Sequence, residues 1–283
     1  MRTLTVAIAL CLVPALPARQ TVVKPYRASP GASVTQELGL CSVRIDYHRP
    51  AVKGRRIWGG LVPYGQVWRA GANEATTIAF SDPVKVGGRD LAAGTYAFFA
   101  IPGPEEWTLV FSRNARQWGS YTYQPAQDAL RLQAKPRAIP HQEYLAYTIQ
   151  VEDPGTLRVE LAWDALAVGF DVAVDAQGRY WAYLEQTLAG AGPGEWQPLD
   201  QGAAYCLASD THLDRAMEWV DRSLRVKEGW RNLSLKAQLL RRAGRAQEGL
   251  PLLRRAIGLA EGGAAGNTVD ELKALEAEWN QQP

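Results

Sequence analysis

Residues 54–77 contain the side chains whose types and spacing best suit a polar binding or reaction site. Arg69, Asn73 and Glu74 place a planar cation, an amide and a carboxylate within six positions. Arg69 suits bidentate binding of a carboxylate or another anion, and Glu74 suits a role as acid, base or anchor for a polar ligand. The alternative is structural: Arg69 and Glu74 pair to brace a long loop, and Asn73 holds a left-handed turn. The residue types alone fit both interpretations.

Aromatic rings, two further arginines (Arg55 and Arg56) and five glycines make up much of the same segment. The glycines allow sharp turns and close backbone approach. Trp58, Tyr64 and Trp68 provide flat faces that either stack against sugar rings or pack in a core. Arg55 has the same ambiguity as Arg69, since it either joins a binding patch or braces the loop. The ligand-binding residues that the segment predicts are therefore Arg55, Tyr64, Trp68, Arg69, Asn73 and Glu74.

The chain has three histidines, and histidine is a common metal ligand. A metal site would require His48 and His141 to converge inside a barrel, with Glu143 on the same strand face as His141. His212 is expected on the surface, at the start of a helix. No nucleophile elbow, phosphate-binding loop, dinucleotide fingerprint or zinc-binding helix motif occurs in the sequence. We therefore expect neither a metal nor a cofactor.

The first residues have the pattern of a secretory signal peptide, which we place at residues 1–18. Arg2 gives a positive start, residues 4–16 are largely apolar, and Ala15 and Ala18 offer a small-residue cleavage region. The run is shorter than the roughly 20 residues that span a bilayer, although an uncleaved anchor is the alternative. We predict an exported protein, periplasmic or extracellular, with no membrane span after cleavage. A formal charge of +2 over 283 residues favours neither nucleic acid nor an anionic membrane as a partner.

Cleavage of the signal peptide would remove Cys11 and leave Cys41 and Cys206. An oxidising compartment would allow these two cysteines to pair. They fall in different predicted domains, however, and we expect a free buried thiol at each position.

From about residue 33 to residue 172 the chain has the pattern of short β-strands separated by turns. Within residues 42–48, Val43, Ile45 and Tyr47 alternate with polar residues, which indicates a strand with one buried face. Gly87 and Gly88 suit the positive φ angles of a tight hairpin. Strands at this regular spacing, with no helices between them, predict an antiparallel β-sandwich or barrel.

After residue 175 the pattern changes to helical periodicity. One apolar face recurs at i, i+3, i+4, i+7 and i+11, at Leu213, Ala216, Met217, Val220 and Leu224. Part of this face returns 33 residues later, where Gly249, Leu253 and Ala256 correspond to Ala216, Val220 and Ser223. Helix pairs that repeat at about 34 residues resemble tetratricopeptide repeats, and a generic helical bundle is the alternative. We place a helical, repeat-like domain at residues 198–280 and predict an α+β multidomain protein.

An ordered series of short motifs covers the β half. It runs from YHRP at residues 47–50 through WRAGANEAT at 68–76 and AGTY at 93–96 to EWT around Trp107 and QWG around Trp118. Over residues 29–172 the series resembles the family called domain of unknown function 2911, which is found in exported bacterial proteins. His48 stands where that family more often has a small polar residue. The resemblance implies a β fold and no particular reaction.

These observations predict an exported envelope protein that acts as a ligand-binding or scaffolding module. The β domain at residues 29–172 would hold a small polar ligand, a glycan or a peptide, and the helical tail would contact a protein partner. The alternative is a hydrolase or a metal-dependent enzyme that uses Glu74 as acid or base. An open pocket lined by Arg69, Asn73 and Glu74 together with His48 favours the enzyme, whereas a buried Arg69–Glu74 pair favours bracing.

Overall fold

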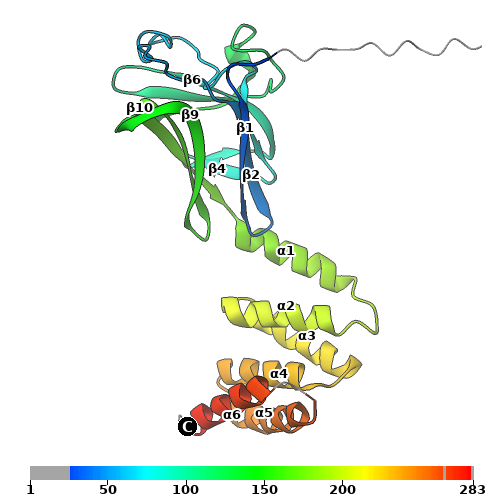
Figure 1. The fold of residues 1–283 in the computed structure, drawn as a ribbon. Helices are drawn as coiled ribbons and strands as arrows, with labels where there is room; N and C mark the ends of the chain where they lie inside the picture. The colour runs from blue at the N-terminus through cyan, green and yellow to red at the C-terminus, as the bar shows by residue number, and fades with distance from the viewer. Residues whose placement is uncertain (1–25, 264–265, 282–283) are drawn as a thin grey trace, which may run out of the picture.

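The computed structural model describes residues 26–263 and 266–281. A β-sandwich comes first, and helices follow it in chain order, leading away from one end of the sandwich (Figure 1). This arrangement confirms the predicted α+β organisation. The predicted signal peptide at residues 1–18 lies outside the described residues. In the described part of the chain, no helix is both long enough and apolar enough to cross a membrane.

Two antiparallel sheets form the sandwich, with the strand orders β1-β2-β3-β6-β7-β8 and β5-β4-β10-β9. The first sheet consists of β1 (Gly31–Leu38), β2 (Cys41–His48), β3 (Thr76–Phe80), β6 (Gly94–Ile101), β7 (Trp107–Ser112) and β8 (Asp128–Ala134). The second consists of β4 (Val84–Val86), β5 (Arg89–Leu91), β9 (Arg137–Asp153) and β10 (Thr156–Val174). The sheets share one apolar core. Of the two predicted alternatives, the structure is therefore the sandwich.

The alternation predicted for β2 is present and decides which side chains face the core. Cys41, Val43, Ile45 and Tyr47 are buried, and the residues between them lie on the outer face. β3 follows the same period of two, as does most of β10. Each fully buried aliphatic or aromatic side chain stabilises the fold by about 1.5–3 kcal/mol, so the shared core holds the two sheets together. The outer face of β2 stays available for polar side chains.

A smaller apolar cluster lies on the outer face of the six-stranded sheet. It consists of Ala75, Ala97, Phe99 and Val110. Tyr123 packs edge-on against Phe99, with ring centroids 5.1 Å apart. Tyr123 belongs to the segment between β7 and β8, which also contains the 3₁₀ helix η1 (Pro125–Gln127). This segment therefore covers part of the outer face and forms a wall beside β1, β2 and β3.

The chain passes from β10 into α1 (Ala176–Ala189) through a single residue, Asp175. Asp175 caps the helix, because its side chain accepts a hydrogen bond of 2.9 Å from the backbone N–H of Gly178. One turn further, Arg179 Nε donates to Asp82 Oδ1 at 2.7 Å, in the loop between β3 and β4. These two contacts attach the first turn of α1 to the end of the sandwich.

The remaining helices are α2 (Gln197–Ser209), α3 (Leu213–Val226), α4 (Trp230–Arg242), α5 (Ala246–Glu261) and α6 (Gly266–Gln281). They pack in chain order, α2 on α3, α4 on α5 and α5 on α6. The apolar face predicted for α3 is buried at Ala216 and Val220, and Leu253 and Ala256 are buried on α5. The helical character of the tail is therefore confirmed, while its similarity to tetratricopeptide repeats stays a prediction.

Cys41 lies in the sandwich core and Cys206 in the core of the first helices, and both are buried free thiols. The prediction of two separate thiols is confirmed. Burial raises the pKa of both thiols, that of Cys206 to about 11.

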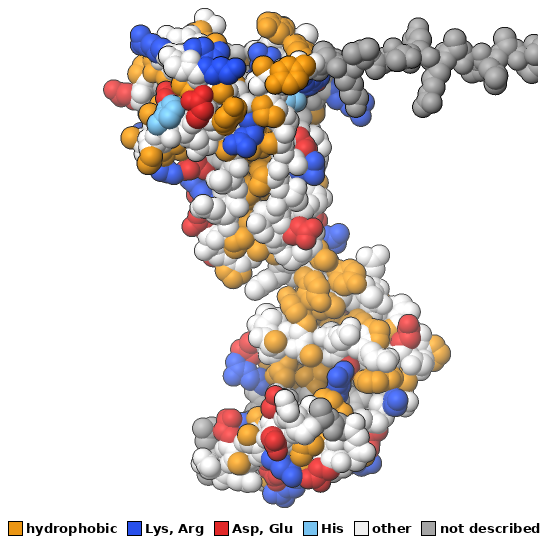
Figure 2. Space-filling view, in the orientation of Figure 1, with side chains coloured by type: hydrophobic (Ala, Val, Ile, Leu, Met, Phe, Trp, Pro, Cys, Tyr) orange, Lys and Arg blue, Asp and Glu red, His pale blue; other side chains and the backbone are white. Residues whose placement is uncertain are grey.

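Charged side chains of both signs are spread over the surface. On the face that Figure 2 shows, Lys and Arg side chains lie among Asp and Glu side chains on both the sandwich and the helices. Several charged side chains of the protein form ion pairs, such as Arg137 with Glu160 and Arg242 with Asp210. This distribution agrees with the formal charge of +2.

Asp200 on α2 is a carboxylate in an unfavourable place. Its Oδ1 atom is buried and has no hydrogen-bond partner among the described residues. Burial raises its pKa from 3.8 to about 6, against an opposing effect of Arg231. The folded chain therefore binds a proton at Asp200 more tightly than the unfolded chain does. As a result, this group lowers the free energy of unfolding as pH rises from 3.8 to about 6.

We expect Asp200→Asn to raise the stability of the protein at pH 7 and to leave it nearly unchanged at pH 4, because the amide has no charge to desolvate. Urea unfolding of the full chain, followed by far-ultraviolet circular dichroism at both pH values, measures the difference. Asp270→Asn, at an exposed position of α6, is the matched control and should be neutral at both. Equal stability of Asp200→Asn and wild type at pH 7 would contradict the prediction.

Candidate functional site

The tryptophans of residues 54–77 pack into the end of the sandwich core. Trp58 is only 8 % exposed, and its ring centroid lies 4.7 Å from that of Trp107. Trp68 stacks on Trp163 with centroids 5.9 Å apart, and its Nε1 donates to the carbonyl of Gly71. Contacts within the protein therefore occupy the faces of Trp58 and Trp68. A sugar-stacking platform would need these faces free.

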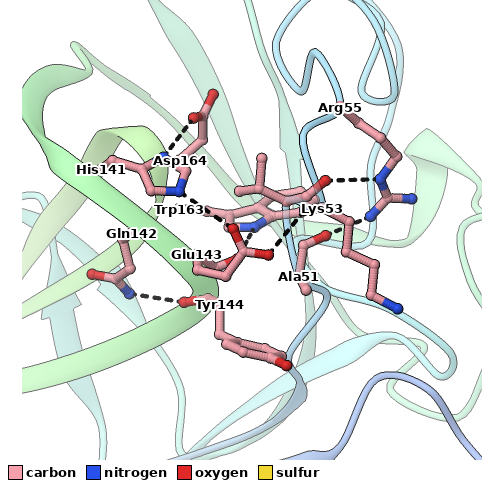
Figure 3. A network of polar contacts seen from close by, with 10 residues as sticks. Ala51, Lys53, Arg55, His141, Gln142, Glu143, Tyr144, Trp163 and Asp164 are labelled. Atoms are coloured by element: carbon pink, nitrogen blue, oxygen red, sulfur yellow. Dashed lines mark hydrogen bonds and ion pairs between the residues drawn. The ribbon is translucent and has the colours of Figure 1, made fainter.

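Two other predicted ligand-binding residues also hold the segment in place. Arg55 Nε donates to the carbonyl of Val52 at 3.0 Å, and its Nη2 donates to the carbonyl of Ala51 (Figure 3). Tyr64 is 40 % exposed, and one edge of its ring lies directly over Gly59. A side chain at Gly59 would come within 2.8 Å of that ring, and the φ angle of 72° at this position also favours glycine. Arg55 therefore makes the contacts expected of a brace, which was the alternative for it.

The histidines do not converge. His141 sits between two carboxylates, 3.3 Å from Glu143 Oε2 and 3.3 Å from Asp164 Oδ1, on the four-stranded sheet (Figure 3). His48 lies on the outer face of the six-stranded sheet. Across the described ranges, no group of three or more His, Cys, Asp and Glu side chains is placed to hold a metal ion.

Arg69 and Asn73 form a brace, although not the predicted one. Arg69 Nη1 donates to the backbone carbonyl of Asn73 at 2.8 Å. Asn73 has the predicted left-handed conformation, with φ of 60°, and its side chain donates to the carbonyl of Ser29. Gly119 lies against the guanidinium, where a side chain would come within 2.8 Å of Nη1. Arg69 is therefore half-buried in a turn and makes no ion pair with Glu74.

Glu74 points away from this brace and lines an open hollow of about 650 Å³ on the outer face of the six-stranded sheet. The hollow lies between the edge formed by β1, β2 and β3 and the segment that follows β7. Its lining comprises Gly31, Ala32, Ser33, Asp46, Tyr47, His48, Glu74, Ala75, Thr77, Ala115, Arg116 and Gln117. The alternation of β2 explains this placement, since Asp46 and His48 are its outward residues. Arg69 and Asn73 are not part of the lining.

A cation from the start of the described chain contacts Glu74. Arg27 Nη1 lies 2.5 Å from Glu74 Oε2 and 3.2 Å from His48 Nε2. The guanidinium also lies 5.5 Å from the ring centroid of Trp118, a residue that is 52 % exposed. Backbone pairing sets this geometry, because residues 73–75 form an antiparallel bridge with residues 117–119 and bring Trp118 beside Glu74.

These contacts decide the charge of the site at neutral pH. The hydrogen bond from Arg27 lowers the pKa of Glu74, so its carboxylate is ionised. Burial lowers the pKa of His48, so its ring is neutral. Because a guanidinium only donates hydrogen bonds, His48 Nε2 must accept and Nδ1 carries the proton, 3.6 Å from Glu74 Oε2.

The sequence analysis named Glu74 and His48, which line the hollow, but it did not name Arg27 or place Trp118 beside Glu74. Arg27 gives no signal, because it lies 47 positions from Glu74 in a segment without regular structure. The position of Asp46 could be predicted from the sequence, since the alternation that buries Val43 and Ile45 also turns Asp46 and His48 to the outer face.

The fold and the hollow define a β-sandwich domain with a polar surface pocket, followed by a helical part. Residues 29–172 match the family described as a protein of unknown function (DUF2911). This match covers just over half of the chain, and the protein belongs to that family. No curated protein and no solved structure matches the chain. The family name carries no activity, so the function has to be argued from the geometry of the pocket.

We expect Arg69→Ala to lower the free energy of unfolding by about 1.5–3 kcal/mol, the range for a lost hydrogen bond to a charged group. Urea unfolding followed by tryptophan fluorescence measures the change. Arg116→Ala is the control, because Arg116 is exposed and forms no hydrogen bond or ion pair with any described residue. A normal unfolding midpoint for Arg69→Ala would show that this arginine is not a brace.

Proposed function

We propose that this protein is an exported, non-catalytic binding module of the cell envelope, whose sandwich holds a small polar ligand at the Glu74 hollow. The observation that carries the proposal is the convergence of an ionised carboxylate and a neutral imidazole acceptor at one open surface hollow outside the core. Export rests on the signal-like pattern of residues 1–18.

The size and chemistry of the hollow support a small polar ligand. Its volume of about 650 Å³ lies within the usual range for ligand sites, about 300–1,000 Å³. Asp46 and Glu74 accept hydrogen bonds, Arg116 donates them, and Ser33 and Gln117 do both. A ligand with several donors and acceptors, such as an amino compound, a short peptide or a glycan, matches this mixture.

The alternative of an enzyme that uses Glu74 as acid or base gains no support from the geometry. A general acid at neutral pH needs a raised pKa, whereas Arg27 lowers the pKa of Glu74 and makes it a weak base as well. His48 contacts Arg27 and Glu74, and no serine or cysteine of the described chain lies within hydrogen-bond distance of its ring. The arrangement suits a fixed anion better than a proton carrier.

For the helical tail we propose contact with an acidic segment of a protein partner. A hollow of about 450 Å³ lies between the starts of α2, α4 and α6 and is lined by Trp196 and Trp230. Lys227 lies 5.7 Å from the Trp196 ring and Arg231 lies 5.1 Å from the Trp230 ring. Neither cation has a carboxylate within ion-pair distance among the described residues, and the carboxylate of Glu228, which also lines the hollow, is paired with Arg255. An acidic segment with an apolar side chain therefore complements the hollow.

We expect the Lys227→Glu, Arg231→Glu double variant to lose binding of acidic, leucine-containing peptides at least about tenfold, because attraction becomes repulsion. Fluorescence anisotropy with a pool of such labelled peptides measures the loss, and a basic pool serves as the specificity control. Lys273→Glu, on the exposed face of α6, should bind like wild type. Equal binding by the double variant, or no binding by wild type, would remove the support for this partner class.

We expect Glu74→Gln to abolish binding of the ligand at the sandwich while the unfolding midpoint stays unchanged, because the side chain is 44 % exposed. The assay is native mass spectrometry of the full chain against amino compounds, sugars and short peptides, followed by calorimetry of each hit. Glu37→Gln, at an exposed position of β1, is the matched control.

The pH dependence of binding provides an independent check. Since the pKa of Glu74 lies below its ordinary value of 4.5, protonation of this carboxylate should weaken binding only as pH falls below 4.5. The pKa of His48 also lies below its ordinary value of 6.5, so a loss of binding between pH 7 and pH 5 would report protonation of this acceptor. Binding that survives Glu74→Gln assigns the ligand to other groups.

A further inference from the structure

Arg27 occupies the recognition groups of the hollow with its own guanidinium. Glu74 provides an ion pair at 2.5 Å, His48 Nε2 provides a neutral acceptor at 3.2 Å, and Trp118 provides a ring face at 5.5 Å. Each of these three contacts favours a cation with N–H donors. The chain thus shows directly which chemical group the site accommodates.

Among the described residues, the arm that carries Arg27 (residues 26–30) makes its backbone hydrogen bonds C-terminal to Arg27. Residues 26–30 form neither helix nor strand. The carbonyl of Ser29 accepts from Asn73 Nδ2, and the carbonyl of Pro30 accepts from the backbone N–H of Arg49. Arg27 itself makes no backbone hydrogen bond to another described residue, and its side chain is 38 % exposed. Its position therefore depends on side-chain contacts, and exposed ion pairs of this kind are weak.

Withdrawal of Arg27 would leave Glu74 with His48 beside it and with no Lys or Arg partner among the described residues. Asp46, the other carboxylate of the lining, already has Arg44 as its partner at 2.6 Å. Arg116 is exposed and not paired with Glu74. The empty position would then offer a carboxylate, an imidazole acceptor and an indole face at the wall of the hollow.

We propose that Arg27 is a built-in competitor and that the hollow binds the guanidinium or alkylammonium group of a cationic ligand, which displaces it. This inference rests on the proposed binding function and adds both the ligand class and its regulation. The arm lowers the apparent affinity by the fraction of time that Arg27 fills the site. Ligand binding and release of the arm are therefore the same event.

The test compares wild type with Arg27→Ala, in the full chain, by calorimetry. The probes are agmatine for a free guanidinium, putrescine for an alkylammonium, and the tripeptide Gly-Arg-Gly for an arginine side chain in a peptide. We expect Arg27→Ala to bind agmatine about two- to sixfold more tightly, as loss of an exposed intramolecular ion pair implies. Arg27→Lys keeps a cation on the arm and should stay near wild type. Comparison of the tripeptide with agmatine and putrescine shows whether the cation comes from a peptide or from a small molecule.

Two variants test the recognition groups in the Arg27→Ala background. Glu74→Gln should abolish the gain, and Trp118→Ala should reduce it, because each removes one contact to the cation. Arg137→Ala is the matched control, since Arg137 is an exposed arginine paired with Glu160 on the other sheet. It should leave agmatine affinity unchanged.

Specific outcomes overturn the inference. If Arg27→Ala binds agmatine no better than wild type, Arg27 is not a competitor. If Arg27→Ala loses binding of acetate and gains none of agmatine, Arg27 is instead an anion receptor. A neutral polar ligand that depends on Glu74 would leave the proposed function standing while this inference fails. Agmatine binding that is unchanged by Glu74→Gln would contradict both this inference and the proposed function.

Discussion

The packing of four indole rings at one end of the sandwich is the constraint on which the rest of the site depends. Trp107 on β7 and Trp163 on β10 come from opposite sheets, and Trp58 and Trp68 enter between them from residues 54–77. Aromatic contacts of this kind add to the burial of large apolar surfaces. They hold in place a long segment that has few ladder hydrogen bonds. They also determine where the chain leaves the core after Ala70, before β3 begins at Thr76.

The Arg69 brace and the hollow both depend on the point where the chain leaves the core. Arg69 turns inward to the carbonyl of Asn73, and the left-handed Asn73 reverses the chain, so that the next side chain, Glu74, faces the outer surface. β2 then provides the opposite wall of the hollow with residues that alternate with its core positions. One strand thus stabilises the sandwich with one face and lines the site with the other, and a shift of one residue in its register would destroy both.

The sandwich, the helical tail and the separate thiols could be predicted from the sequence, because period-two and helical patterns are local signals. Glu74, which lines the hollow, was chosen as a candidate site residue, and Asn73 was predicted as a left-handed turn, both from residue type alone. The ion pair of Arg69 with Glu74 was a wrong alternative, since sequence proximity cannot show that a left-handed residue turns two side chains in opposite directions. Arg27 lay beyond sequence reasoning because no periodicity links an irregular arm to a residue 47 positions away. The burial of Trp58 could not be predicted from the sequence either, since a buried tryptophan and a ligand-stacking tryptophan look the same in a sequence.

The isolation of Cys41 and Cys206 has a consequence for redox chemistry. A thiolate, not a thiol, attacks disulfides and reacts with oxidants, and the raised pKa of both buried groups keeps them as thiols at neutral pH. Neither forms a cross-link with the other, since they lie in separate cores. The stability of the sandwich and of the first helices therefore comes from packing and hydrogen bonds, without a disulfide between these two cysteines. It does not depend on the reduction potential of the surrounding compartment, nor does the folding of these parts require an oxidant.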